Sequence, residues 1–84
     1  VIADSGFGGV KQKVDRRLLI RKAQAAPETY PEFKGNVDCV QTAGFFRPAK
    51  ESPSRQGYHW NGNAETYYLI GEAMGEAMKK LYAK

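Results

Sequence analysis

The strongest hydrophobic pattern in the chain lies near its carboxyl-terminal end. Apolar and small residues recur there at the three- and four-residue spacing of one helix face: Tyr67, Ile70, Gly71, Met74, Met78 and Leu81. Glutamates and lysines fill the positions between them, so we expect one face to pack and the others to meet water. Asn61 or Asn63 is suited to cap the start of this helix, with Glu65 in its first turn. The pair Gly71 and Gly75, four residues apart, predicts a close approach of the helix to a sheet.

A second helix is predicted over residues 11–26, where Pro27 ends it. We expect its apolar residues to face inward: Val14, Leu18, Leu19, Ala23 and Ala26. The basic residues of the same segment then occupy its solvated side: Lys11, Lys13, Arg16, Arg17, Arg21 and Lys22. They are a large share of the 13 Lys and Arg residues in a chain of net charge +4. We interpret this basic side as an ordinary solvated face, and phosphate binding is the alternative.

Two short segments have the composition of buried strands. Residues 1–3 are apolar and precede the glycine-rich turn "DSGFGG", and residues 37–42, "VDCVQT", are rich in β-branched side chains. A long loop is predicted over residues 45–63. The order of strand, helix, strand and helix is typical of an α/β protein with a parallel sheet. Two strands and two helices do not complete such a layer, so we expect the carboxyl-terminal part of a larger α/β domain.

Composition limits the classes of protein to which this chain can belong. A chain of 84 residues, 42% of them hydrophobic, is expected to form at most one small globular domain, without a membrane-spanning helix. Its first residues lack the basic and apolar regions of a signal peptide, and we expect the chain to begin within a longer protein. The single Cys39 excludes an internal disulfide and is expected to be a buried structural thiol. One cysteine and one histidine do not suffice for a zinc site, and no cofactor is expected.

The only histidine, His59, lies in the long loop directly before the last predicted helix. In parallel α/β sheets the loops after the strands collect the functional groups, which makes His59 a candidate site residue. Tyr58 and Trp60 flank it, and their rings are suited either to stack on a sugar or acyl group or to anchor the loop. Asn61 is a further substrate-binding candidate, with helix capping as its ordinary role.

Two segments, "YPEFKGNVDCVQT" and "FFRPAKESPSRQGYHWNGNAETYYLIGEAMGEAM", resemble the carboxyl-terminal end of SGNH-fold carbohydrate esterases. The resemblance is to the sialate O-acetylesterase-like proteins related to acetylxylan esterases, and it covers roughly residues 28–82. Its most specific element is "SPSRQGYHWNGNAETYYLIGEAMG". It implies a flavodoxin-like parallel sheet, of which residues 1–84 form a partial domain completed by an upstream segment. It also implies an extracellular or periplasmic serine esterase that removes acetyl groups from an acetylated carbohydrate.

In this family the last sequence block contributes the catalytic histidine, so the resemblance implies that His59 is the general base and acid. Many SGNH enzymes have an aspartate three residues before this histidine, whereas this chain has Gln56 there. A glutamine oxygen is able to accept the ring N–H and orient the imidazole, but it does not stabilise the imidazolium with a full charge. The nucleophilic serine of the family lies in a G-D-S-like block that these residues do not contain. Ser5, in "ADSGFGG", is interpreted as a turn residue.

The isolated chain is therefore expected to lack esterase activity. One alternative is a small basic binding module that uses residues 11–22 for nucleic acid or another anionic partner. Another is a non-catalytic structural relative, in which Gln56 marks lost chemistry. The sequence leaves both alternatives open.

Overall fold

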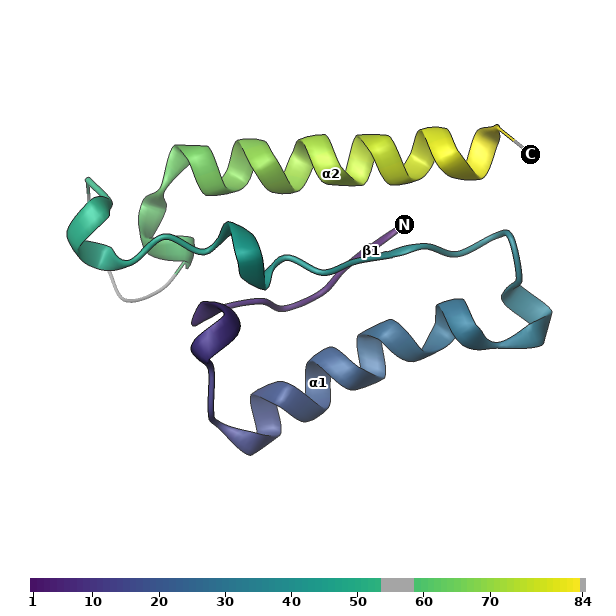
Figure 1. Cartoon of the computed structure of the whole chain (residues 1–84), viewed down its shortest axis with the longest axis horizontal. Coiled ribbons are helices and arrows are strands. Elements are labelled where there is room, and N and C mark those ends of the chain that lie inside the picture. Colours follow the sequence, from purple (N-terminus) through teal and green to yellow (C-terminus); the bar gives the residue numbers. More distant parts are fainter. Residues whose placement is uncertain (54–58, 84) are drawn as a thin grey trace.

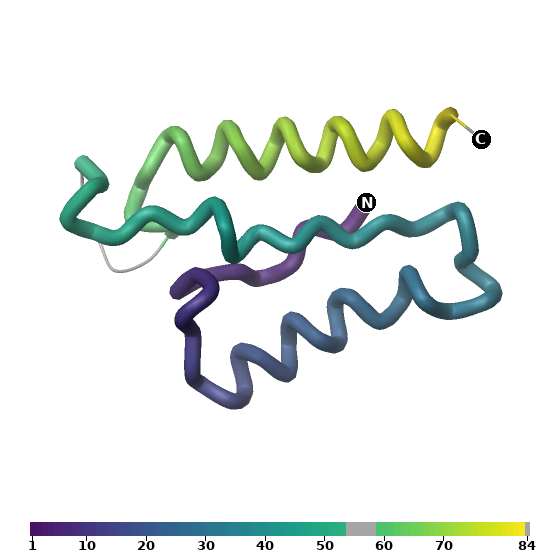
Figure 2. Tube along the Cα trace, viewed as in Figure 1, coloured from purple at the N-terminus to yellow at the C-terminus, as the bar shows by residue number. Residues whose placement is uncertain are grey.

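The computed structural model describes residues 1–53 and 59–83. Its strands and main helices are β1 (Ile2–Ala3), α1 (Asp15–Ala25), β2 (Cys39–Val40) and α2 (Ala64–Tyr82). The strands run parallel, with Ile2 opposite Cys39. Helix α1 lies on one side of the strand pair and α2 on the other (Figure 1), and the Cα trace in Figure 2 follows the same three layers. The predicted order of strand, helix, strand and helix is confirmed, and the chain has mixed α/β character.

Helix α2 begins at a cap that the sequence predicts. Asn63 Oδ1 accepts a hydrogen bond of 3.0 Å from the backbone N–H of Thr66, which satisfies one of the free donors at the helix start. Thr66 and Ala77 are buried, so small side chains lie on the packed face of the helix. The Lys80 ammonium lies 3.1 Å from Asp38 Oδ2 and connects the end of α2 to the segment before β2.

The packed face of α2 is rotated from the predicted one. Tyr67 and Met78, which were expected to pack, are 49% and 42% exposed. Gly71 and Gly75 are exposed as well, and a Cβ atom on either glycine would meet nothing within 4 Å. The prediction that these glycines pack closely against the sheet is therefore wrong. Ala77, which is small and apolar, occupies the packed position instead.

The inward face of α1 is polar, which contradicts the predicted arrangement. Four of the five residues expected to pack are exposed: Val14, Leu18, Leu19 and Ala23. Arg21 and Gln24 face the loop after β1 instead and bond to its backbone. That loop leaves regular secondary structure, so its carbonyl and N–H groups need side-chain partners, which an apolar helix face does not supply. The helix also starts later than predicted, at Asp15, and Gly9–Lys11 forms a separate 3-10 turn.

A buried Asp–Thr pair joins the carboxyl ends of the two strands. Asp4 follows β1 and Thr42 lies just beyond β2, at 7% and 0% exposure. Asp4 Oδ1 accepts bonds from the Thr42 backbone N–H at 2.8 Å and from the Thr42 hydroxyl at 2.9 Å. The Thr42 hydroxyl oxygen accepts a bond of 3.1 Å from the Gly6 N–H. The pair therefore holds the loop after β1 against the segment after β2.

Candidate functional site

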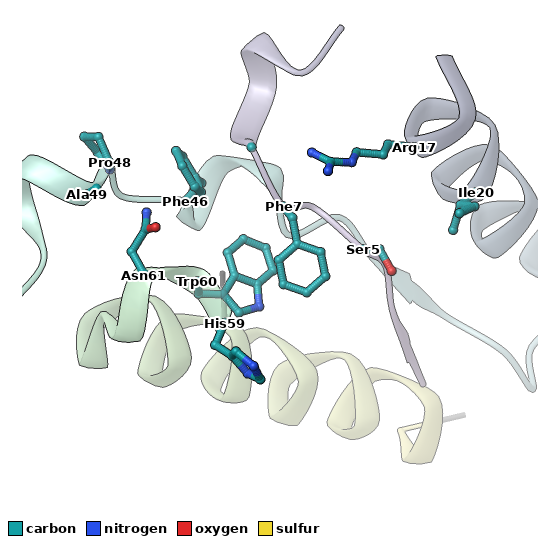
Figure 3. Close-up of a pocket in the computed structure, with 11 residues that line it drawn as sticks. Ser5, Phe7, Arg17, Ile20, Phe46, Pro48, Ala49, His59, Trp60 and Asn61 are labelled. Carbon is teal, nitrogen blue, oxygen red and sulfur yellow. The ribbon is translucent and has the colours of Figure 1, made fainter. Parts of the chain in front are cut away.

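An open cavity of about 740 Å³ lies where the loops after both strands meet the turn before α2. Its lining residues are drawn as sticks in Figure 3. The side chains that bear on its chemistry are Ser5 and Phe7 from the loop after β1, Arg17 from α1, and His59, Trp60 and Asn61 from the turn. The cavity thus lies beyond the carboxyl ends of the parallel strands, which is where open α/β sheets bind ligands.

His59 opens a turn whose backbone has the left-handed conformation. Four successive residues have positive φ: His59 at 52°, Trp60 at 54°, Asn61 at 58° and Gly62 at 64°. Glycine adopts this conformation readily and asparagine tolerates it, whereas it is unfavourable by about 1–2 kcal/mol for each of the other two residues. Such strain persists only where the surroundings enforce it, and it concentrates at functional sites. The backbone of the turn therefore marks His59 as a candidate independently of its side-chain chemistry.

Two polar side chains hold this turn in place. Asn61 Nδ2 donates to the Arg47 carbonyl oxygen at 2.7 Å. The Tyr67 hydroxyl, from the first turns of α2, donates to the His59 carbonyl oxygen at 2.9 Å. Asn63 caps α2 directly after the turn. These bonds connect the turn to the preceding loop and to α2, and they supply the constraint that left-handed residues need.

Trp60 anchors the turn among aromatic rings. It is 8% exposed, and its ring centroid lies 4.7 Å from that of Phe7 and 6.5 Å from that of Phe46. Figure 3 shows the Phe7 ring against the indole. The interpretation of Trp60 as an anchor of the loop is therefore confirmed, and Trp60 also lines the cavity. Sequence reasoning missed Phe7, whose signal was a phenylalanine set between glycines just after a predicted strand.

Helix α1 holds the loop of Phe7 through polar contacts. The Arg21 guanidinium donates to three carbonyl oxygens, those of Ser5 at 3.0 Å, Phe7 at 2.8 Å and Gly9 at 3.1 Å. Gln24 Oε1 accepts a bond of 2.7 Å from the Ser5 N–H. A loop bonded at alternate residues to one helix is preorganised, so this wall of the cavity has a defined shape.

The Ser5 hydroxyl belongs to the same set of contacts. Gln24 Nε2 donates to Ser5 Oγ at 3.0 Å. In Figure 3 Ser5 lies on the α1 side of Phe7, whereas His59 lies on the α2 side of Trp60. These contacts agree with the prediction that Ser5 is a turn residue.

The structure brings three of the predicted site residues together. His59, Trp60 and Asn61 line one cavity, and His59 is exposed. The cap of α2 is Asn63, not Asn61, so the helix start does not use Asn61. Gln56 and Tyr58, the predicted orienting and substrate-binding residues, lie outside the described residues.

Cys39 lies in β2 and is half-buried, which is less burial than the sequence predicts. Burial, together with the negative charges of Asp4, Glu28 and Asp38, raises the pKa of its thiol. A raised pKa keeps the sulfur protonated and weakly nucleophilic at neutral pH, as in a structural thiol. In the part of the chain that the structure describes, no three His, Cys, Asp or Glu side chains are grouped so as to hold a metal ion.

A scan of protein-family models found no match, and searches of curated proteins and of solved structures found none either. Across residues 1–53 and 59–83, neither helix combines the length and the apolar character needed to cross a membrane. The functional proposal therefore rests on the geometry of the candidate site and on the chemistry of its residues.

Proposed function

We propose that this chain is the carboxyl-terminal part of an SGNH-type carbohydrate O-acetylesterase, in which His59 is the general base and acid. The observation that carries the proposal is the position of His59 on an enforced left-handed turn beside an open cavity. A general base must reach the reacting atoms of a substrate, and backbone strain is maintained where function requires it. The resemblance of "SPSRQGYHWNGNAETYYLIGEAMG" to this family points to the same residue.

The proposed reaction has two stages, and His59 accepts and returns one proton in each. Neutral imidazole removes the proton of a serine hydroxyl while the serine oxygen bonds to the acetyl carbon. The carbon–oxygen bond to the sugar then breaks, and the imidazolium returns the proton to the departing sugar oxygen. Water, deprotonated in turn by His59, attacks the acetyl carbon of the acetyl-serine. The imidazolium returns this proton to the serine oxygen as its bond to the acetyl carbon breaks, which releases acetic acid and the free serine.

The nucleophilic serine is proposed to lie in a G-D-S-type segment that packs beside this chain. Two features of the described residues support a larger sheet. A two-stranded parallel sheet is smaller than those that cover a core alone. In addition, Leu18 and Leu19 of α1 are 39% and 64% exposed. Further strands and their connections would bury this apolar surface.

The proposal is tested by labelling the complete gene product that contains these residues with a fluorophosphonate, which reacts with activated serines. Mass spectrometry then locates the adduct. We expect one labelled serine in a G-D-S-type block and much slower labelling in a His59→Asn variant, because the serine is activated by the imidazole. An unlabelled protein, or labelling at the same rate in the variant, would contradict the proposal. Tyr82→Ala, at an 82% exposed position near the end of α2, is the matched control.

A second candidate function, binding of an anionic polymer, is favoured by one observation on the basic segment. Lys13, Arg16 and Lys22 are exposed, and within residues 1–53 and 59–83 none of them forms an ion pair. Uncompensated basic charge binds phosphates by counterion release, so affinity for an oligonucleotide should fall steeply with salt. Replacing all three residues by Gln should weaken such binding and reduce its dependence on salt. Undetectable binding by the parent chain at low salt removes this candidate.

A further inference from the structure

Phe7 is an exposed aromatic residue on a fixed backbone. It is 45% exposed, it lines the cavity, and its ring plane is inclined by 40° to that of Trp60 at a centroid distance of 4.7 Å. Gly8 and Gly9, the next two residues, have φ of 84° and 72°. This left-handed backbone, which glycine adopts at no steric cost, lets the chain turn directly after Phe7. The ring is thus placed at the cavity by a turn that other residues would strain.

The backbone of Phe7 is also tied down by side chains. Its carbonyl oxygen accepts bonds from Arg21 Nη2 at 2.8 Å and from Gln12 Nε2 at 3.0 Å. On the other side of Phe7, a Cβ atom on Gly6 would lie 2.5 Å from the Ala43 nitrogen, so the loop is closely packed there. Burial of a large ring would be favourable, yet this fold holds the ring partly in water. A rigid, partly exposed ring in a cavity is the arrangement of a ligand contact.

We propose that Phe7 is the platform on which a pyranose ring of the carbohydrate stacks. This inference rests on the proposed function, which supplies the sugar. A pyranose presents a face of C–H bonds, and the negative face of an aromatic ring attracts those hydrogens as it attracts the edge of another ring. Trp60 is only 8% exposed, so Phe7 offers the accessible aromatic surface of the pair.

The platform would make Phe7 a specificity-determining residue. Phe7 and His59 line the same cavity, so a sugar stacked on the Phe7 ring lies in the cavity that His59 also lines. A pyranose gains this contact, whereas a small acetate ester without a ring does not. Phe7 therefore favours acetylated sugars over simple acetate esters.

Trp60 provides the reporter for a binding test. It is the only tryptophan in these 84 residues, so their tryptophan emission comes from the ring beside Phe7. The complete gene product, with any tryptophan outside these residues replaced by phenylalanine, is titrated with xylotetraose, an unacetylated oligomer of a pyranose, and the emission of Trp60 is recorded. We expect a saturable change for the parent chain and an affinity about tenfold lower for Phe7→Ala.

Two further variants distinguish the effect of the aromatic ring on affinity from the effect of its apolar volume. Phe7→Leu keeps an apolar side chain without a ring and should bind as weakly as Phe7→Ala, whereas Phe7→Tyr keeps the ring and should bind like the parent. Phe33→Ala, which removes a 39% exposed ring outside the cavity lining, is the matched control and should not change the affinity. Circular dichroism confirms that each variant is folded. No saturable change in the parent, or equal affinities in the parent and the Leu variant, overturns the platform.

The outcomes distinguish this inference from the esterase proposal. Sugar binding that depends on the Phe7 ring, in a complete gene product without esterase activity, keeps the platform and refutes the esterase. Esterase activity with the same kcat/KM for an acetylated xylooligosaccharide in the parent and in Phe7→Leu refutes the platform and keeps the esterase. If Phe7→Leu lowers kcat/KM for the oligosaccharide but not for a small acetate ester without an aromatic ring, both the platform and the esterase are supported.

Discussion

Replacing Asn61 tests whether the turn at the cavity has the strained left-handed backbone described above. Asn61 has φ of 58°, is 5% exposed and donates to the Arg47 carbonyl oxygen at 2.7 Å. Asn61→Gly removes this bond but introduces the residue that best tolerates positive φ. Asn61→Ala removes the same bond and keeps a Cβ atom on the left-handed backbone. The difference between the two variants therefore isolates the backbone.

The expected magnitudes follow from these two effects. Loss of one net hydrogen bond lowers the free energy of unfolding by about 1 kcal/mol. The left-handed conformation is unfavourable for alanine by about 1–2 kcal/mol, and the greater freedom of glycine in the unfolded chain offsets about 0.4–1 kcal/mol of the difference. We therefore expect both variants to lose at least about 1 kcal/mol, and Asn61→Ala to be less stable than Asn61→Gly by roughly 1 kcal/mol.

Urea unfolding followed by far-UV circular dichroism measures both losses. The matched control is Gly44→Ala, because Gly44 lacks a positive φ and a Cβ atom there would meet nothing within 4 Å. Its free energy of unfolding should stay unchanged or rise by up to about 1 kcal/mol. If Asn61→Ala is as stable as Asn61→Gly, the turn is not held in the left-handed conformation and the reasoning is refuted.

Three other expectations concern the fold. Gly71→Ala and Gly75→Ala should each raise the midpoint of thermal unfolding, since an exposed helical glycine is unfavourable by about 0.5–1 kcal/mol relative to alanine; a lower midpoint would show that the glycines pack. Gly6→Ala should lower the free energy of unfolding in urea by about 1–3 kcal/mol, because its Cβ atom would overlap backbone at Ala43; unchanged stability would contradict the close contact. The raised pKa of Cys39 means that its alkylation by iodoacetamide should accelerate at higher pH in the folded chain than in urea. Folding favours the neutral thiol, and this contribution to stability is complete below the pKa of the thiol in the unfolded chain and is lost as pH rises through its pKa in the folded chain. Identical pH profiles of alkylation in the folded chain and in urea would contradict the raised pKa.

Local signals in the sequence predict part of this fold well. Helix α2 has a long periodic pattern and a capping asparagine, and both depend only on residues near one another in the chain. The two strands were predicted from short apolar segments, although β2 is shorter than residues 37–42. Which of Asn61 and Asn63 caps the helix depends on the conformation of the turn between them, and the sequence does not specify it.

The inward face of α1 shows where sequence reasoning fails. The apolar pattern assumes that a helix packs against apolar neighbours, but the neighbour of α1 is an irregular loop with backbone groups to satisfy. Arg21 and Gln24 meet that need and therefore face inward. Their role depends on a contact between parts of the chain that are distant in sequence.

The sequence points to His59 as a site residue, but it does not predict most of the structure around it. His59 and its cavity neighbours Trp60 and Asn61 were predicted from their position before α2. The left-handed backbone of His59 and Trp60 has little sequence signal, because positive φ is uncommon for residues other than glycine. Phe7 joins the site from the other end of the chain, through the contact that Asp4 and Thr42 make between the strand ends.

The central claim, that His59 is the general base and acid of an acetylesterase, is tested most directly by one kinetic comparison. The complete gene product and its His59→Asn variant are assayed for acetate release from an acetylated xylooligosaccharide. Asparagine tolerates positive φ, so the turn keeps its backbone while the imidazole is lost. We predict a fall in kcat/KM of at least about a thousandfold, as for loss of a triad histidine. A variant that keeps kcat/KM within about tenfold of the parent value would contradict the claim.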